Sequence, residues 1–368
     1  MPRLSGSATP VGTAAFARRA VETRRLPAEH FRTAPGALVL SSLGLGTYIG
    51  RPDASTDAAV EQAVALSVSS GRVNVLDTAI NYRYQRAERS VGRALRRQID
   101  EGAVARDEVF IATKNGYFAP DAESGLTPSR WIETELVRPG ILDLGSVVDG
   151  CHSMAPGYLA DQFARSRENL GVDVVDLLYL HNAADAQLAV VGPEEFDRRL
   201  RAAFTLYERF RSEGSLGAYG LATWDCLRRP PDAPGHLSLE SAVESARAVG
   251  GPSHGFRFVQ FPFNLSMPEA CTVRNQMVRG KLYTLFEAAD RLGLGCFTSV
   301  PLLQGQLARA GPARDGLSPA QTALQWARSV PGTIGPLVGQ KSPEHLRENL
   351  EVASRPPWAE TRFRGILS

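Results

Sequence analysis

Lysine is scarce in this sequence, and a large excess of either charge is missing. Only three lysines, Lys114, Lys281 and Lys341, occur among the 41 basic residues. A buried lysine can lose its proton near neutral pH whereas arginine cannot, so each lysine is a candidate for a chemical role. The basic residues face 39 acidic ones, which leaves a formal net charge of +2. A nucleic-acid-binding protein would show a larger basic excess, so we expect no nucleic-acid partner.

Cysteine is also rare, and long apolar runs are missing. The four cysteines lie far apart and form no C-x-x-C pair: Cys151, Cys226, Cys271 and Cys296. This spacing predicts neither a zinc site nor a redox motif, and we expect no bound metal and a cytoplasmic location. No apolar run reaches the roughly 18 residues of a transmembrane helix, so no membrane association is expected. The choice between a monomer and a homo-oligomer stays open.

The length of 368 residues, of which 43% are hydrophobic, allows a large core. This composition excludes a disordered protein and a disulfide-stapled mini-domain, but the length fits either two domains or one α/β barrel. Residues 1–28 are rich in arginine, alanine and hydroxyl side chains, and most of their charges follow the weak apolar stretch 11–17. A signal peptide has the opposite order. We therefore expect a flexible N-terminal arm, or one packed against a neighbouring molecule.

Short apolar runs alternate with longer amphipathic segments along the rest of the chain. The runs predict eight strands: Leu43–Thr47, Asn74–Asp77, Val109–Thr113, Val175–Leu180, Ala218–Ala222, Phe258–Phe261, Gly295–Ser299 and Gly335–Val338. The amphipathic segments predict eight helices: Asp57–Ser70, Ala87–Gln98, Pro156–Leu170, Pro193–Glu213, Leu239–Val249, Lys281–Leu292, Ser318–Ser329 and Pro343–Ala353. Nearly continuous apolar strands are typical of parallel sheets covered on both faces.

Eight strand–helix units in sequence predict a (β/α)8 TIM barrel. A doubly wound sheet is the alternative, but it would usually carry a G-x-G-x-x-G turn after its first strand, and Leu43–Gly46 does not match that pattern. We expect residues 1–38 to form the N-terminal arm with a possible hairpin at the barrel bottom, 39–354 the barrel and 355–368 a tail. Long loops should follow the third strand, at 115–155, and the fifth, within 224–255.

Polar residues end several of the predicted strands. Asp77, Lys114 and His181 follow strands two, three and four, Gln260 lies in strand six, and Tyr82 comes five residues after Asp77. Active sites of such barrels lie at the carboxyl ends of the strands, so these side chains should meet there. A tyrosine can donate a proton near neutral pH if an ammonium group lies close, and a carboxylate can hold that ammonium in place. A histidine can donate a hydrogen bond to a substrate oxygen.

From about Val39 to Ala353 the sequence strongly resembles the aldo-keto reductase family. The resemblance is carried by these segments: Leu43–Thr47, Asp77–Ala79 with Tyr82, Glu88 and Gly92, Ile111–Lys114, Val175–His181, Gly214–Gly220, Val259–Gln260, Pro301–Leu302 with Gly305, Gly339–Ser342, and Glu348–Asn349. It implies a TIM barrel that catalyses reversible hydride transfer between NADPH and an aldehyde or ketone, without a metal. Tyr82 would be the general acid, Lys114 would tune it, Asp77 would hold Lys114, and His181 would orient the substrate.

The resemblance also implies the residues around the ligands. Lys341 and Ser342 lie where a cation and a helix N-terminus can bind the extra phosphate of NADPH, which favours NADPH over NADH. The full set expected around the cofactor is Thr47, Tyr48, Asp77, Thr223, Gln260, Ser299, Pro301, Leu302, Gln304, Gly305, Gly339, Lys341, Ser342, His345, Glu348 and Asn349. The set expected around the small-molecule carbonyl or alcohol substrate is Tyr48, Tyr82, Tyr117, Phe118, His181 and Trp224.

Three departures from the pattern of the family occur, at four positions. The usual Ser-Asn pair after strand five is replaced by Ala222 and Thr223, an aromatic platform for the nicotinamide is replaced by Ser299, and His345 stands where many members carry Arg or Gln. Two alternatives to a reductase stay open, and only the first follows from weaker nicotinamide binding. One is a redox-neutral lyase, dehydratase or isomerase that uses the same acid and base groups. The other is a non-catalytic, cofactor-binding regulatory subunit.

Overall fold

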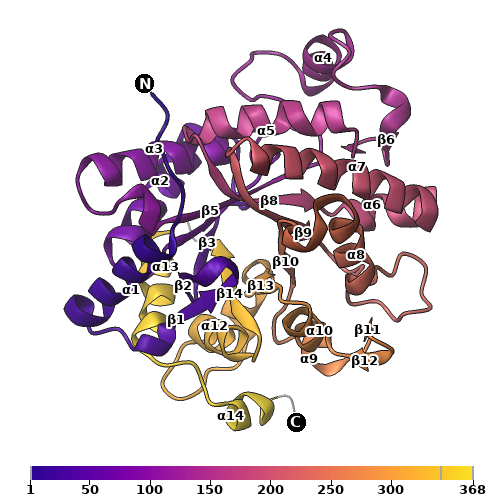
Figure 1. Ribbon diagram of the computed structural model, residues 1–368. Helices are drawn as coiled ribbons and strands as arrows, with labels where there is room; N and C mark the ends of the chain where they lie inside the picture. Colours follow the sequence, from indigo (N-terminus) through magenta and orange to yellow (C-terminus); the bar gives the residue numbers. More distant parts are fainter. Residues whose placement is uncertain (1, 340–341, 367–368) are drawn as a thin grey trace.

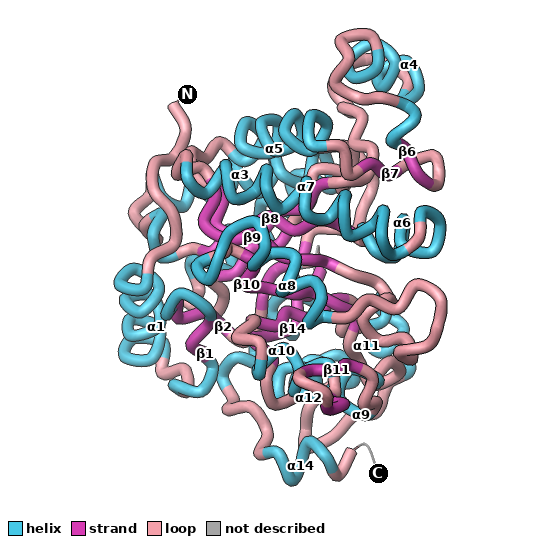
Figure 2. Tube along the Cα trace, turned by 45° about the vertical axis from the view of Figure 1, so that its right-hand side comes forward, coloured by secondary structure: helices cyan, strands magenta, loops and turns pink. Residues whose placement is uncertain are grey.

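The computed structural model describes residues 2–339 and 342–366. Its centre is a closed barrel of eight parallel strands, in the order β10-β13-β14-β3-β4-β5-β8-β9 (Figures 1 and 2). The barrel strands are β3 (Gly44–Gly46), β4 (Val75–Asp77), β5 (Phe110–Asn115), β8 (Val175–His181), β9 (Leu216–Ala222), β10 (Phe256–Pro262), β13 (Gly295–Ser299) and β14 (Thr333–Gly339). The predicted (β/α)8 fold is thus confirmed, and the doubly wound sheet is excluded.

Helices surround the barrel in both views (Figures 1 and 2). The helices that alternate with the strands are α2 (Ala54–Ser69), α3 (Arg86–Asp100), α5 (Pro156–Leu170), α7 (Pro193–Ser212), α8 (Leu239–Gly250), α10 (Leu285–Arg291), α12 (Pro319–Ser329) and α13 (Pro343–Leu350). Further short helices are α4 (Pro128–Ile132), α6 (Ala183–Val191), α9 (Glu269–Thr272), α11 (Gln306–Ala310) and α14 (Glu360–Arg364). Because helices cover the outer face and side chains fill the inside, every residue of β8 is buried.

The interior of the barrel is closed at the amino ends of its strands by an antiparallel hairpin, β1 (Phe31–Ala34) and β2 (Leu38–Ser41). Ala34 and Leu40 of the hairpin belong to the same buried cluster as the aromatic rings inside the barrel. Three of those rings, Phe110, Phe258 and Phe297, pack with centroids 5.5–6.3 Å apart. The barrel is therefore solid below the site, and its open end is the carboxyl end of the strands.

The N-terminal segment contains a helix that packs on the barrel of its own chain. Residues Pro10–Arg24 form helix α1, whose N-cap Thr9 accepts a hydrogen bond from the Gly12 amide at 2.9 Å. The Arg19 guanidinium binds the Glu108 carboxylate at 2.6 Å and so ties the helix to the barrel. A Cβ on Gly12 would lie 2.4 Å from the carbonyl oxygen of Asp107, so only glycine allows this close approach.

The structure differs from the predicted helix at 281–292, and it adds secondary structure to the predicted long loop at 115–155. Residues Lys281–Tyr283 form strand β12, which pairs with β11 (Gln276–Val278), and the helix begins only after Thr284, which caps it together with Glu287. The sequence pattern therefore placed the helix start too early, and Lys281 lies on a hairpin. The long segment 115–155 contains α4 and a small hairpin of β6 (Val147–Val148) and β7 (His152–Ser153). No helix among the described residues is long and apolar enough to cross a membrane.

Candidate active site

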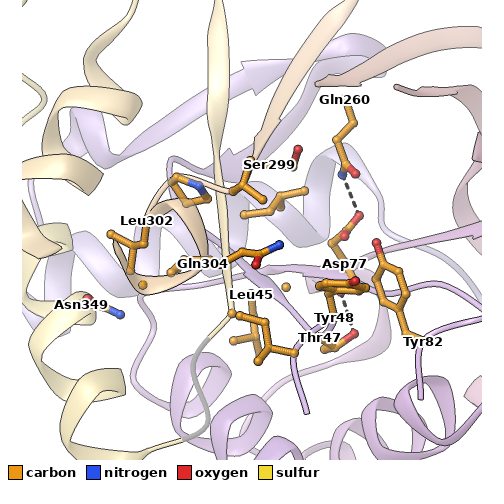
Figure 3. A pocket seen from close by; sticks show the side chains of 18 of the residues that line it. Leu45, Thr47, Tyr48, Asp77, Tyr82, Gln260, Ser299, Leu302, Gln304 and Asn349 are labelled. Carbon is orange, nitrogen blue, oxygen red and sulfur yellow. Dashed lines mark hydrogen bonds between the residues drawn. The ribbon is translucent and has the colours of Figure 1, made fainter. Parts of the chain in front are cut away.

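A cavity of about 870 Å³ opens at the carboxyl ends of the barrel strands. It extends from Tyr82 and His181 on one side to the N-terminal part of α13 on the other. Figure 3 shows Asp77 and Tyr82 at one end, Asn349 at the other, and Leu302 and Gln304 between them. A pocket of this size and place is the usual ligand site of a barrel enzyme.

A buried ion pair lies beneath the reactive end of the cavity. The Lys114 ammonium, at the end of β5, binds Asp77 Oδ1 at 2.5 Å and the carbonyl oxygen of Thr78 at 2.8 Å. The second carboxylate oxygen of Asp77 accepts a hydrogen bond from Gln260 Nε2 at 2.9 Å (Figure 3). Lys114 is fully buried and does not line the cavity itself. The pair is therefore held rigidly, because each charged group has several partners.

Tyr82 lies between this ion pair and the open cavity. The Lys114 ammonium is 5.0 Å from the centroid of the Tyr82 ring. Edge-to-face contacts join the Tyr82 ring to Tyr48, at 5.0 Å between centroids, and to His181, at 5.8 Å. The phenol of Tyr82 and the imidazole of His181 are thus neighbours at the cavity wall, as proximity at strand ends predicts.

Burial controls the protonation of these groups. It raises the pKa of Tyr82 well above its ordinary value, and the Asp77 carboxylate adds to that effect. Burial lowers the pKa of Lys114 against the opposing attraction of Asp77. Burial also lowers the pKa of His181 well below its ordinary value, so this imidazole is neutral and offers one N–H donor. Tyr82 consequently holds its proton in the free protein.

The turn that follows Tyr82 has an unusual backbone. Arg83, Tyr84 and Gln85 all have positive φ angles, of 50°, 53° and 72°, which side-chain-bearing residues rarely adopt. Buried bonds hold the turn: Arg83 Nη1 binds Asp57 Oδ1 at 2.5 Å, and Gln85 Nε2 donates to the carbonyl oxygen of Ala119 at 2.8 Å. The sequence pattern did not indicate this turn, since no glycine occurs in it.

The far end of the cavity is lined by residues of the last strand–helix unit. Ser342 caps α13 by accepting a hydrogen bond from the His345 amide at 3.4 Å. The Ser318 hydroxyl donates to Glu348 Oε1. Of the sixteen residues expected around the cofactor, Lys341 lies outside the described residues, and the cavity is lined by Thr47, Tyr48, Asp77, Thr223, Gln260, Ser299, Pro301, Leu302, Gln304, Gly305, Gly339, Ser342, His345, Glu348 and Asn349.

Of the positions that depart from the family pattern, His345 lies at the far end of the cavity, and Ala222, Thr223 and Ser299 lie at the reactive end. Ala222 ends strand β9 and Thr223 follows it. Both line the cavity, and the Thr223 hydroxyl donates to the carbonyl oxygen of Gln260 at 3.2 Å. Ser299 lines the cavity at the end of β13, next to Val300, whose φ of 47° is strained for a β-branched residue. Trp224 also lines the cavity, with 46% of its surface exposed.

Phe118 is the one expected substrate residue that the structure places elsewhere. Its ring packs edge-to-face on Tyr158, with centroids 6.0 Å apart, in a separate cluster around Trp131. The reason is the alternation of side chains after β5, which turns Tyr117 toward the cavity and Phe118 away from it. Tyr48, Tyr82, Tyr117, His181 and Trp224 all line the cavity.

The lining also includes residues that the sequence pattern did not indicate, among them Ile49, Asn182 and Arg309. Asn182 directly follows His181 and has a left-handed backbone, with φ of 47°. Its place after a strand-end histidine is a signal that could have found it. Ile49 and Arg309 follow no comparable pattern. Among the described residues, no group of three or more potential ligands could hold a metal ion.

The fold and the site together define an enzyme-like (β/α)8 barrel with a polar cluster under its open end. Residues 42–232, more than half of the chain, match the aldo/keto reductase family. The chain belongs to this family, which supports an oxidoreductase activity. No curated protein sequence matches the chain.

Solved aldo-keto reductases have the same fold. One from Klebsiella pneumoniae, in complex with NADP and acetate, is 17% identical to this chain and has a TM-score of 0.60. The match covers 92% of this chain and 94% of the Klebsiella chain. The holo form of one from Bacillus halodurans is 18% identical, with coverages of 92% and 95% and a TM-score of 0.61. A second structure from Klebsiella pneumoniae, in complex with NADPH, is 18% identical, with coverages of 91% and 94% and a TM-score of 0.58.

Proposed function

We propose that the protein reduces an aldehyde or ketone to an alcohol with NADPH, reversibly, and that Tyr82 is the general acid. The observation that carries this proposal is the cluster of Tyr82, His181 and the Asp77–Lys114 pair at the wall of one cavity. A buried phenol beside an ammonium group suits proton donation to a developing alkoxide. Structures of similar fold that contain NADP or NADPH agree with this cofactor.

The residues of the cavity fit a dinucleotide. Its volume of about 870 Å³ and its length from Tyr82 to α13 suit an elongated ligand. At the far end, the N-terminus of α13 with Ser342 and His345 would hold a phosphate group, while Glu348 and Asn349 would contact the adenine. Arg309 adds a cation to the lining between the two ends. Thr223 and Ser299 would border the nicotinamide.

The chain's own residues would direct the proton. Bound NADPH supplies a hydride to the carbonyl carbon of the substrate. The neutral His181 imidazole would donate a hydrogen bond to the carbonyl oxygen and orient it. Tyr82 would transfer its phenolic proton to that oxygen as the carbonyl π bond breaks, which completes the alcohol. The Lys114 ammonium, 5.0 Å from the ring, would stabilise the tyrosinate that remains, and Asp77 would keep Lys114 in place.

Titration of the purified protein with NADPH and NADH, followed by turnover with a panel of aldehydes and ketones, tests the proposal. We expect tighter binding of NADPH than of NADH, and its oxidation by at least one carbonyl compound. Tyr82→Phe should abolish most of the turnover, whereas Tyr84→Phe, a neighbouring tyrosine that does not line the cavity, should not. Undetectable binding of both nucleotides would favour a redox-neutral reaction. Binding without turnover, unaffected by Tyr82→Phe, would favour a regulatory subunit.

A further inference from the structure

The carbonyl group of His181 lies at the end of β8, just beyond the last residue of β8 that pairs with β5. On one side, the Asn182 amide donates to the carbonyl oxygen of Ala222 in β9 at 2.6 Å. The carbonyl of a trans peptide points opposite to its N–H, so the His181 carbonyl faces β5. The pairing of β5 with β8 ends at Asn115 opposite Leu180. The His181 carbonyl therefore needs a hydrogen-bond donor from outside the barrel strands, because it is buried.

His152 supplies that donor from the hairpin in the long loop after β5. Its Nε2 lies 2.9 Å from the carbonyl oxygen of His181, and the imidazole is fully buried. The loop is held against the end of β5 by main-chain bonds from Phe118 N to Cys151 O, at 2.8 Å, and from Ser153 N to Gly116 O, at 3.0 Å. The ring of Tyr117 packs between the imidazoles of His152 and His181, at 5.0 and 5.1 Å.

The space for this imidazole depends on Gly116. The glycine has a φ of +123°, and a Cβ at this position would lie 2.6 Å from His152 Nε2. The chain thus leaves the barrel at a glycine, and the His152 imidazole fills the space that a side chain at position 116 would take.

A chain of hydrogen bonds fixes which nitrogen of His152 carries the proton. Arg199 Nη1 can only donate, and it binds Gln187 Oε1 at 2.9 Å. The amide nitrogen of Gln187 therefore donates to His152 Nδ1, also at 2.9 Å. Burial lowers the pKa of His152 to about 4, so the ring is neutral above that pH. Nε2–H is then the donor, and it points at His181.

We propose that His152 is a positioning residue, which pins the peptide between His181 and Asn182 so that both side chains face the substrate end of the cavity. The peptide is held at its N–H by Ala222 and at its carbonyl by His152. Asn182, in its left-handed conformation, lines the cavity beside His181. The inference rests on the proposed function, in which His181 orients the carbonyl substrate. It assigns to the long loop the task of aligning that histidine.

Kinetics of four variants test the inference. His152→Leu keeps the volume but loses the donor, and we expect kcat/KM to fall about 10- to 100-fold, as displaced catalytic groups do. The Kd of NADPH should change less than about twofold, because the cofactor contacts lie on other strands. His152→Gln, which keeps an N–H donor, should recover part of the loss, and Gly116→Ala, which displaces the imidazole, should reproduce it. His254→Leu replaces another buried histidine outside the cavity and should leave kcat/KM unchanged.

A measurement without turnover separates this inference from the proposed function. In histidine-labelled protein, ¹H–¹⁵N correlations should show His152 as the Nε2–H tautomer, and His152→Leu should shift the imidazole signals of His181 but not those of His254. If the wild type reduces no carbonyl, the proposed function fails and the NMR result alone decides the positioning role. Unchanged His181 signals, a normal kcat/KM in His152→Leu, or an equal loss in His254→Leu would each overturn it.

Discussion

Two buried cations, one at each end of the barrel, are satisfied in different ways. At the carboxyl ends of the strands, Lys114 pairs with the Asp77 carboxylate. At the amino ends, Arg328 is equally buried but, within residues 2–339 and 342–366, forms no salt bridge with a carboxylate. Its guanidinium donates instead to neutral acceptors: Ser42 Oγ, Gln325 Oε1 and the carbonyl oxygens of Val352 and Arg355.

This difference separates a reactive site from a structural one. Lysine is able to exchange its proton, and the Asp77 carboxylate favours the charged form of Lys114 beside Tyr82. Arginine stays charged and offers five N–H donors in a rigid plane, so Arg328 can join the hairpin, α12 and the segment after α13 through their carbonyl and hydroxyl groups. Substitutions at the two ends should consequently affect different quantities, activity at one and stability at the other.

The largest effect is expected at the reactive end, from Tyr82→Phe. Loss of the phenolic proton should lower kcat about 10²- to 10⁴-fold, the usual contribution of general acid catalysis. The ring contacts with Tyr48 and His181 remain possible, so the melting temperature should change little. Steady-state kinetics and thermal unfolding measure the two quantities. A kcat within threefold of the wild type would show that another group donates the proton.

At the other end, Arg328→Met should destabilise the fold by about 3–5 kcal/mol, because several buried acceptors lose their donor at once. The kcat/KM of the folded fraction should not change. Urea unfolding gives the free energy, and Arg198→Met, at an exposed pair with Glu195, serves as the control with a cost of at most about 1 kcal/mol. A loss of activity without a loss of stability would contradict the division between the two ends.

A pH effect of intermediate size is expected from His30 at the barrel bottom. Burial, reinforced by the nearby Arg328 cation, lowers the pKa of His30 to about 3, from 6.5. Between these two pH values, His30 binds a proton in the unfolded chain but stays neutral in the folded chain. His30 alone should therefore lower the stability as the pH drops below about 6.5, by up to about 1.4 kcal/mol per pH unit. His30→Asn should flatten this slope in urea titrations at several pH values, and an unchanged slope would exclude His30 as its origin.

The smallest effect, on the free energy of unfolding, is expected from substitutions in two strained turns, one at each end of the barrel. Tyr84, after the proposed acid, and Ala37, in the β1–β2 hairpin, have left-handed φ angles of 53° and 59°. Asparagine tolerates this conformation, so Tyr84→Asn and Ala37→Asn should each raise the free energy of unfolding by about 0.5–1 kcal/mol. Only the first lies near the site, and kcat should stay constant in both. A lower kcat in Tyr84→Asn would show that the strain contributes to the alignment of Tyr82.

Much of the fold could be predicted from local patterns. Eight buried strands were recognisable because parallel strands covered on both faces leave continuous apolar runs, and the observed bounds differ by only a few residues. Asp77, Lys114 and His181 were recognisable because the barrel topology brings strand ends together. The helix expected from Lys281 was misplaced because the β11–β12 hairpin depends on pairing between segments, which periodicity does not reveal.

Local sequence patterns are enough to predict the alternation of strands and helices, and hence the barrel and the strand ends at which its polar side chains gather. The support of those side chains depends on contacts between segments that lie far apart in the chain. His152 reaches His181 across 29 residues of chain, Arg83 binds Asp57 across 26, and Phe118 turns away to a separate cluster. The physical reason is that periodicity reports which face of an element is buried, whereas hydrogen bonds between distant segments depend on where the loops pack in three dimensions.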